Sequence, residues 1–256
     1  MEVRACEILD EPLKDEKSPS LRSLLTRPVV ISVANYGLIG LLEMMAGVLI
    51  PLVWSTPVEL GGLSMSPASI GVWMAGYGCL NGLYQFVIFP LIVDRFGPRR
   101  VFIVSIASFA PMYLLLYFEN MTLRYAGRAG SVTVVLIVLQ LSSMAIADMG
   151  FGKVVRRIYV RRHADPYVDS KGSVFMYVSS SAPSRRSLGA TNGLAQTMVS
   201  IQRTVAPAAA ASLFAFSLNS NILGGNFTYV VLSALVCVGL CIAVQLPKNT
   251  WKPAEK

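Results

Sequence analysis

Charged side chains are scarce in this sequence: they make up 14% of its 256 residues, whereas a typical soluble domain has about 25%. Six stretches of 18 to 29 residues hold at most one charge each, and these are residues 29–54, 69–93, 101–118, 131–152, 190–218 and 227–246. One soluble interior could not bury six such segments, whereas a helix of about 20 apolar residues spans a bilayer. The sequence therefore predicts an all-α, polytopic membrane protein with six transmembrane helices, because a backbone in lipid must satisfy its hydrogen bonds within the helix.

Metal-ligating and catalytic residue patterns are also missing. The only histidine, His163, has no partner ligands at metal spacing. Of the four cysteines, Cys6 precedes the first span, while Cys79, Cys237 and Cys241 lie within spans, where helix packing is the simpler interpretation. No nucleophile–base pair, phosphate-binding glycine loop or pair of catalytic carboxylates is present. We therefore predict no metal site, no cofactor and no enzyme activity.

The basic residues predict the orientation. Residues 1–28 are too polar for a signal peptide, and we interpret them as a cytosolic tail. Six spans place both ends on one side, and 19 of the 22 Lys and Arg residues lie there, including those of a second tail at 248–256. By the positive-inside rule this side is cytosolic. The net charge of +8 then reflects topology and contact with anionic lipid rather than nucleic acid, and either the plasma membrane or the vacuolar membrane would fit.

Two glycosylation sequons lie on the other side of the predicted membrane. Asn120 and Asn226 each begin an Asn-x-Thr triplet, and both fall in predicted external loops, 119–130 and 219–226. Acceptor sites must face outward, so the two sequons agree with the orientation and are glycosylation candidates.

The short connection between the second and third spans is densely charged. Gly97 and Pro98 predict a tight reversal there, and an acid at the end of a helix opposes the helix dipole, so the acid needs an arginine or another helix N-terminus. The motif consists of Asp94, Arg95, Gly97, Arg99 and Arg100. A positive-inside anchor is the simpler interpretation of this cluster.

These residues resemble the G-x-x-x-D-R-x-G-R-R/K loop motif of the major facilitator superfamily, with Pro90 standing where the leading glycine is usual. Residues 20–45 and 183–217 are similar to the linker with the seventh helix, and to the eleventh helix, of the fungal drug-transporter and zinc-induced-facilitator-like branch. The resemblance implies that residues 1–28 correspond to the central linker and that the six spans are helices seven to twelve, half of a major facilitator fold. A missing N-terminal six-helix half or a second copy would be the partner.

Three charges lie inside the predicted spans, where each costs about 2.5–3.5 kcal/mol on insertion scales: Glu43, Asp148 and Arg203. The resemblance places the spans of Glu43 and Asp148 at the substrate cavity. Because desolvation favours the neutral form of a carboxyl, either acid could load and release a proton; a structural pair with Arg203 is the alternative. Asn35 and Gln140 are uncharged candidates for substrate contact, with interhelical packing as their alternative.

Together these features predict transport of a small molecule by alternating access, coupled to protons, by the C-terminal half of a facilitator. The partners would be the lipid bilayer, the substrate and protons. The alternative is a fragment or partner subunit that does not transport.

One segment interrupts the resemblance. Residues 153–173 carry six of the 22 basic residues and separate residues 29–152, with spans one to four, from residues 174–247, with the rest of the fourth helix and the last two spans. We interpret the segment as a retained intron; a regulatory loop or a lipid-binding basic patch is the alternative.

Overall fold

The structure is a computed structural model that describes residues 24–126, 130–150, 173–184 and 187–246. No strand occurs in these ranges, and the helices are α3 (Arg27–Ser55), α4 (Pro67–Phe96), α5 (Pro98–Ala126), α6 (Ser131–Asp148), α7 (Ser173–Ser180), α8 (Leu188–Asn219) and α9 (Phe227–Ala243), with short 3-10 turns η1 (Val58–Leu60) and η2 (Ile222–Gly225). Each of the six predicted apolar stretches begins within its own helix, and these helices are α3, α4, α5, α6, α8 and α9. The predicted all-α class is therefore confirmed.

Four helices, α3, α4, α5 and α6, are long and apolar enough to cross a membrane, and α9 is a shorter apolar helix of 17 residues. α8 is the longest of the described helices at 32 residues. It falls outside this group, and polar residues such as Gln202 and Arg203 interrupt its apolar sequence. A multi-pass membrane protein is thus supported by length and composition, while the count of six spans remains a prediction.

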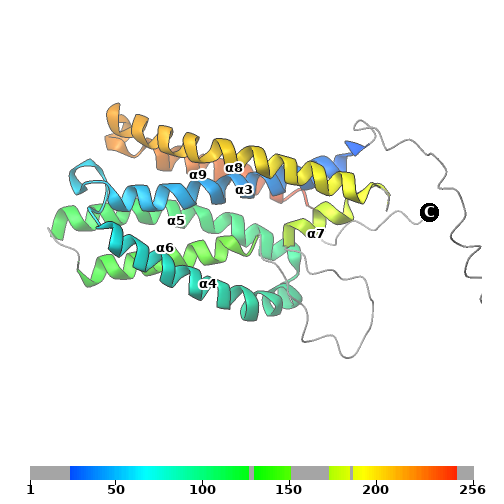
Figure 1. The fold of residues 1–256 in the computed structure, drawn as a ribbon, viewed down its shortest axis with the longest axis horizontal. Coiled ribbons are helices and arrows are strands. Elements are labelled where there is room, and N and C mark those ends of the chain that lie inside the picture. The colour runs from blue at the N-terminus through cyan, green and yellow to red at the C-terminus, as the bar shows by residue number, and fades with distance from the viewer. Residues whose placement is uncertain (1–23, 127–129, 151–172, 185–186, 247–256) are drawn as a thin grey trace, which may run out of the picture.

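The helices form a bundle around α3 and α5. α8 and α9 pack along α3, α9 also packs along α5, and α6 lies on the other side of α5 (Figure 1). Gly239 of α9 permits this approach, because an added Cβ would lie 2.6 Å from the side chain of Leu38. Small residues at such contacts let membrane helices approach closely.

α4 is the least embedded of the long helices. α3 buries 14 residues, whereas α4 buries only Phe89. α4 contacts α5, α6 and α3 from the edge of the bundle (Figure 1). Its attachment therefore depends on a small number of contacts.

The structure corrects two predicted boundaries. The external loop predicted at 119–130 is wrong over its first part, because α5 continues to Ala126. The residues that follow Glu119 are compatible with a helix, and the Glu119 charge is buried instead of ending the span. α6 ends at Asp148, before the predicted end at residue 152.

The two tails and the basic insert fall largely outside the description: residues 1–23, 151–172 and 247–256 are not described. The prediction for 153–173 therefore remains a prediction. The residues after it begin a separate short helix, α7, which packs against α3, α5 and α8.

Candidate functional site

A stripe of polar side chains on α4 meets the end of α6. Tyr77, Asn81 and Gln85 are spaced four residues apart and so lie on one face of the helix. The Tyr77 hydroxyl donates to Oδ2 of Asp148 at 2.6 Å, and the Asn81 amide donates to the same oxygen at 2.7 Å. The Gln85 amide donates to the main-chain oxygen of Asp148 at 3.4 Å. This ladder joins α4 to α6 through one acidic residue.

Asp148 occupies an electrostatically unfavourable position. It is the last residue of α6, at the negative end of that helix's dipole, and it is only 9% exposed. Both donors to Oδ2 are neutral, and within the described residues Oδ1 is buried with no hydrogen-bond partner. The carboxyl is therefore held by hydrogen bonds without a compensating cation beside it.

The other two predicted charges lie in the same region. Glu43 of α3 is partly buried and interacts electrostatically with both Asp148 and Arg203. Arg203 is exposed on α8. Among the residues that the structure describes, these three form no ion pair within 4.0 Å, so Arg203 does not make the buried pair considered from the sequence. Glu43 thus lies within electrostatic reach of one carboxyl and one guanidinium.

The two uncharged candidates differ in their contacts. Asn35 is fully buried, and its amide donates to the main-chain oxygen of Ile31 at 2.8 Å and to that of Ile242 at 3.5 Å, so it ties α3 to α9. Gln140 of α6 is also fully buried, but neither polar atom of its amide has a partner in the described part of the chain. Leaving such a group unsatisfied costs about 1–3 kcal/mol. The Asn35 amide nitrogen thus links α3 to α9, while the Asn35 side-chain oxygen and both polar atoms of the Gln140 amide lack a hydrogen-bond partner in the described part of the chain.

A cavity of about 890 Å³ opens between α4 and α6. Its walls are mainly aliphatic and aromatic, and Tyr77 and Asn81 are among the residues that line it. The polar ladder to Asp148 is thus one edge of an apolar groove. Tyr77 is a residue that the sequence analysis missed, because nothing in the local sequence shows that it meets a residue 71 positions away.

The charged turn between α4 and α5 has the predicted reversal. Gly97 ends α4 with φ 81° and ψ 154°, and its N–H bonds to the oxygen of Val93 at 2.9 Å. Arg99 donates to the main-chain oxygen of Val244 at 2.7 Å, at the end of α9. A cation there complements the negative end of that helix, so Arg99 fastens the turn to α9.

The remaining motif residues make fewer contacts. Arg95 lies 5.7 Å from the centre of the Phe96 ring, and Arg100 is exposed. Asp94 is exposed, and within the described residues it has neither of the partners that the sequence analysis required of it.

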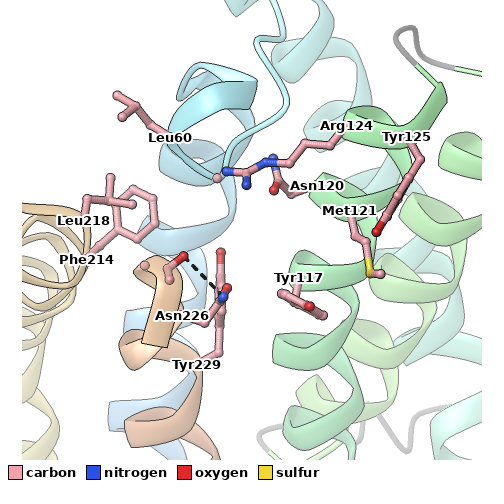
Figure 2. Close-up of a pocket in the computed structure, with 13 residues that line it drawn as sticks. Leu60, Tyr117, Asn120, Met121, Arg124, Tyr125, Phe214, Leu218, Asn226 and Tyr229 are labelled. Carbon is pink, nitrogen blue, oxygen red and sulfur yellow. Dashed lines mark hydrogen bonds between the residues drawn. The ribbon is translucent and has the colours of Figure 1, made fainter. Parts of the chain in front are cut away.

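A third buried acid was missed by the sequence analysis. Glu119 of α5 is fully buried, and its Oε2 accepts a hydrogen bond from the indole N–H of Trp54 at 3.2 Å, while Oε1 has no partner in the described part of the chain. It lies at the opposite end of the bundle from Asp148 and Gly97. The neighbouring pocket, of about 220 Å³, is lined by Arg124, Tyr229 and other residues of α5, α8 and α9 (Figure 2).

The two sequon asparagines also lie around this pocket (Figure 2). Asn120 is 8% exposed, and its amide nitrogen donates to the oxygens of Val58 at 3.0 Å and Gly62 at 2.7 Å. Because the sugar would be attached to that nitrogen, this fold disfavours glycosylation of Asn120. The Asn226 nitrogen donates to the oxygen of Leu223 at 3.0 Å and is less enclosed.

Long apolar helices with acidic residues between them define the class of a polytopic membrane protein. Comparisons with known proteins add a family. No family model matches the chain, and no solved structure matches it. Curated relatives do match: the chain is 26% identical over 242 residues to the major facilitator-type transporter psiT2 of Psilocybe cyanescens, covering 94% of this chain and 44% of that protein.

Two further relatives come from a mould and a plant. The chain is 23% identical to the major facilitator superfamily multidrug transporter mfsB of Aspergillus fumigatus, over 90% of this chain and 35% of the relative. It is 28% identical to Protein ZINC INDUCED FACILITATOR 1 of Arabidopsis thaliana, over 91% and 43%. The chain thus spans less than half the length of these relatives. The chain is similar to major facilitator transporters, which confirms the family resemblance, and these relatives are transport proteins rather than enzymes.

Proposed function

We propose that this chain is the C-terminal half of a facilitator that moves a small molecule across a membrane by alternating access, coupled to protons. The relationship to major facilitator transporters supports the transport of small molecules. The observation that supports proton coupling is the electrostatic interaction between Glu43 of α3 and Asp148 of α6. Ionisable residues inside membrane helices are functional by default, because their insertion is costly.

Alternating access would use these acids as follows. A carboxyl exposed to water favours its charged form, and the same carboxyl in a closed, dry site favours its neutral form. Opening and closing of the cavity would therefore release and load a proton at Glu43 and Asp148. Tyr77 and Asn81 would hold the Asp148 carboxyl in place through this cycle, since both donate to Oδ2.

The outer face of α8 supports a partner for this half. Arg203 is exposed there, together with the polar residues Gln196 and Ser200. A guanidinium facing lipid costs about 2.5–3.5 kcal/mol on insertion scales, so this face is better suited to a water-filled cavity or a second protein surface. The missing six-helix half or a second copy of this chain would supply that surface, and Asp94 at the charged turn would meet its helix end.

Transport is tested by reconstituting the chain in lipid vesicles, alone and with an N-terminal six-helix half of a relative, with a pH gradient across the membrane. The expected result is proton release from the vesicles, reported by an enclosed pH-sensitive dye, when a transported compound is added. A chain that folds and pairs with the other half but never moves protons or solute would instead be the non-transporting partner subunit.

A further inference from the structure

The pocket at the end of the bundle opposite the charged turn is too small for a whole drug-sized molecule. Its volume of about 220 Å³ lies below the usual range of about 300–1,000 Å³ for such sites. It lies between the last turns of α5, the end of α8 and the start of α9, and Tyr117 stands opposite Asn226 and Tyr229 across it (Figure 2). The pocket therefore suits one group of a larger ligand.

Arg124 brings a positive charge to this pocket, and among the described residues that line it no other is charged. Its Nε donates to the main-chain oxygen of Val58 at 3.2 Å, and its Nη2 donates to that of Glu59 at 2.9 Å. Both acceptors are neutral carbonyls of η1, so they orient the guanidinium without neutralising it. A guanidinium has five N–H donors, which leaves others for a ligand.

Two carboxyls lie near Arg124 in the fold, and neither lines the pocket. Glu119 is fully buried and accepts from the indole of Trp54, and the Glu59 side chain is exposed on η1. In the described part of the chain Arg124 forms no ion pair within 4.0 Å. An anionic group in the pocket would therefore meet a held guanidinium, and hydrogen bonds from arginine to phosphate are among the strong ones.

An apolar stripe on α5 leads away from the pocket. Its members are large, exposed side chains spaced so that they share one face of the helix, and they are Leu114, Tyr117, Phe118, Met121 and Tyr125. α5 is long and apolar enough to cross a membrane, so this stripe would face acyl chains. Tyrosine and arginine near the end of a span are typical of the headgroup level. The stripe and the pocket therefore suit one amphipathic ligand.

We propose that the pocket binds the phosphate group of a phospholipid from the leaflet at this end of the bundle, with Arg124 donating to the phosphate oxygens and an acyl chain lying along the α5 stripe. The bilayer itself supplies a molecule with both parts, a phosphodiester and long apolar chains. In the predicted orientation this is the outer leaflet. The site is separate from Glu43 and Asp148, and the inference does not depend on the proposed transport function.

The test is lipid retention by the full chain, purified free of phospholipid in a mild detergent and measured by native mass spectrometry. The probe is a phosphatidylcholine, and we expect one molecule to be retained per chain. Diacylglycerol with the same acyl chains lacks the phosphate, and inorganic phosphate lacks the chains; each should need at least tenfold higher concentration to displace the probe. Phosphatidate, which keeps the phosphate and lacks the choline, should compete at least as well as unlabelled phosphatidylcholine.

Variants locate the site. Arg124→Gln keeps a hydrogen-bond donor of similar reach and removes the charge, and it is expected to weaken retention of the probe at least tenfold. Arg27→Gln makes the same change at an exposed arginine at the start of α3, at the other end of the bundle, and should leave retention unchanged.

A photoreactive probe tests the location on the unaltered chain, so the inference stays testable if Arg124→Gln does not fold. Phosphatidylcholine with a diazirine in one acyl chain is expected to attach to the α5 stripe, as read from peptide masses. Equal retention of diacylglycerol, displacement by inorganic phosphate at the concentration of the probe, full retention by folded Arg124→Gln, or attachment spread evenly over the exposed helices would each overturn the inference.

Discussion

The two acids, Glu43 inside α3 and Asp148 at the end of α6, differ in what surrounds them. Asp148 accepts two short hydrogen bonds on one oxygen, while Glu43 interacts electrostatically with Asp148 and Arg203. A carboxyl without fixed donors changes its protonation at little structural cost. Glu43 is therefore better suited to exchange protons than Asp148, whose carboxyl is held by Tyr77 and Asn81.

We predict that Glu43→Gln, in a complete transporter containing this half, abolishes proton-driven accumulation and leaves folding intact. Gln keeps the shape of the side chain but cannot take up a proton in this pH range. Accumulation of a transported compound in vesicles with a pH gradient measures the first effect, and size-exclusion chromatography the second. Unchanged accumulation would remove Glu43 from the mechanism, and loss of the protein from the membrane would favour a structural role.

The Trp54–Glu119 contact allows a prediction about stability. Among the described residues, Trp54 is the only hydrogen-bond donor to the fully buried Glu119 carboxyl. Trp54→Phe removes it, and leaving such a group unpaired costs about 1–3 kcal/mol. We expect the unfolding temperature in detergent to fall. Glu119→Gln keeps an acceptor for the indole and serves as the matched control. Equal, additive losses for Trp54→Phe and Glu119→Leu in a double-mutant cycle would show that the two residues are not coupled.

At this scale the sequence predicted the acids within the longest apolar stretches but not their partners. Glu43, Asp148 and Arg203 stand out because charge is rare in those stretches. Tyr77 meets Asp148 only through the packing of α4 on α6, and no local pattern encodes that contact. Glu119 was assigned to a loop because a charge at the end of an apolar run looks like the end of a span.

Among the elements, the α4–α5 turn depends most on one backbone conformation. The φ of 81° and ψ of 154° at Gly97 lie in a region that side chains other than glycine occupy at a cost of about 1–3 kcal/mol. We predict that Gly97→Ala lowers the unfolding temperature and loosens the Arg99 contact with the end of α9. Gly71→Ala, on a helical position with open space around it, is the control and should be neutral or slightly stabilising.

Asp94 lies in the same turn but should behave differently. It is exposed and has no partner in the described residues, so Asp94→Asn is expected to leave the stability of this chain nearly unchanged. In a full-length transporter, where the motif would face the other half, the same change should impair transport. Thermal unfolding of the chain and flux through the full-length protein test the two parts. Equal destabilisation in both settings would make the motif a local feature.

The helices themselves were predictable because membrane insertion forces apolar residues into long uninterrupted runs. The turn at Gly97 was predictable because Gly tolerates a positive φ and Pro fixes its own φ, so that the pair favours a turn. The ends of the helices were harder to predict. α5 extends eight residues beyond the predicted run, to Ala126, because its last turns are stabilised by contacts with η1 that only the folded chain reveals.

For the whole molecule, orientation is the first property to test. With both ends in the cytosol, the η1 turn faces outward. Cysteines placed at Glu59, which is exposed, and at Lys248 should then react with an impermeant thiol reagent from opposite sides of the membrane in a background without native cysteines. Gly62 is a poor choice for the label, because an added Cβ would meet the backbone of Thr56. Reaction of both positions from one side would contradict the six-span topology.

The basic insert separates two pieces that pack on the same neighbours. α6 ends at Asp148, and Gly150 just beyond it lies against Ile39 and Ser105 of α3 and α5. α7 also packs against α3 and α5, and in Figure 1 it lies at the same end of the bundle as the end of α6. Two helical pieces on the same pair of neighbours are compatible with one longer helix.

Deleting residues 153–173 would join residue 152 to residue 174 and allow α6 to continue into α7. Asp148 would then lie inside a helix rather than at its negative end, which removes the unfavourable interaction with the dipole. We predict that the deletion protein unfolds at a higher temperature and, paired with a complementary half, transports at least as well as the full chain. Sequencing the messenger RNA supplies the independent check, because a retained intron requires a spliced message that lacks these codons and GT and AG at the boundaries. A dominant message that keeps the codons, together with a deletion protein of lower stability, would make the segment a functional cytosolic loop whose basic residues face anionic lipid.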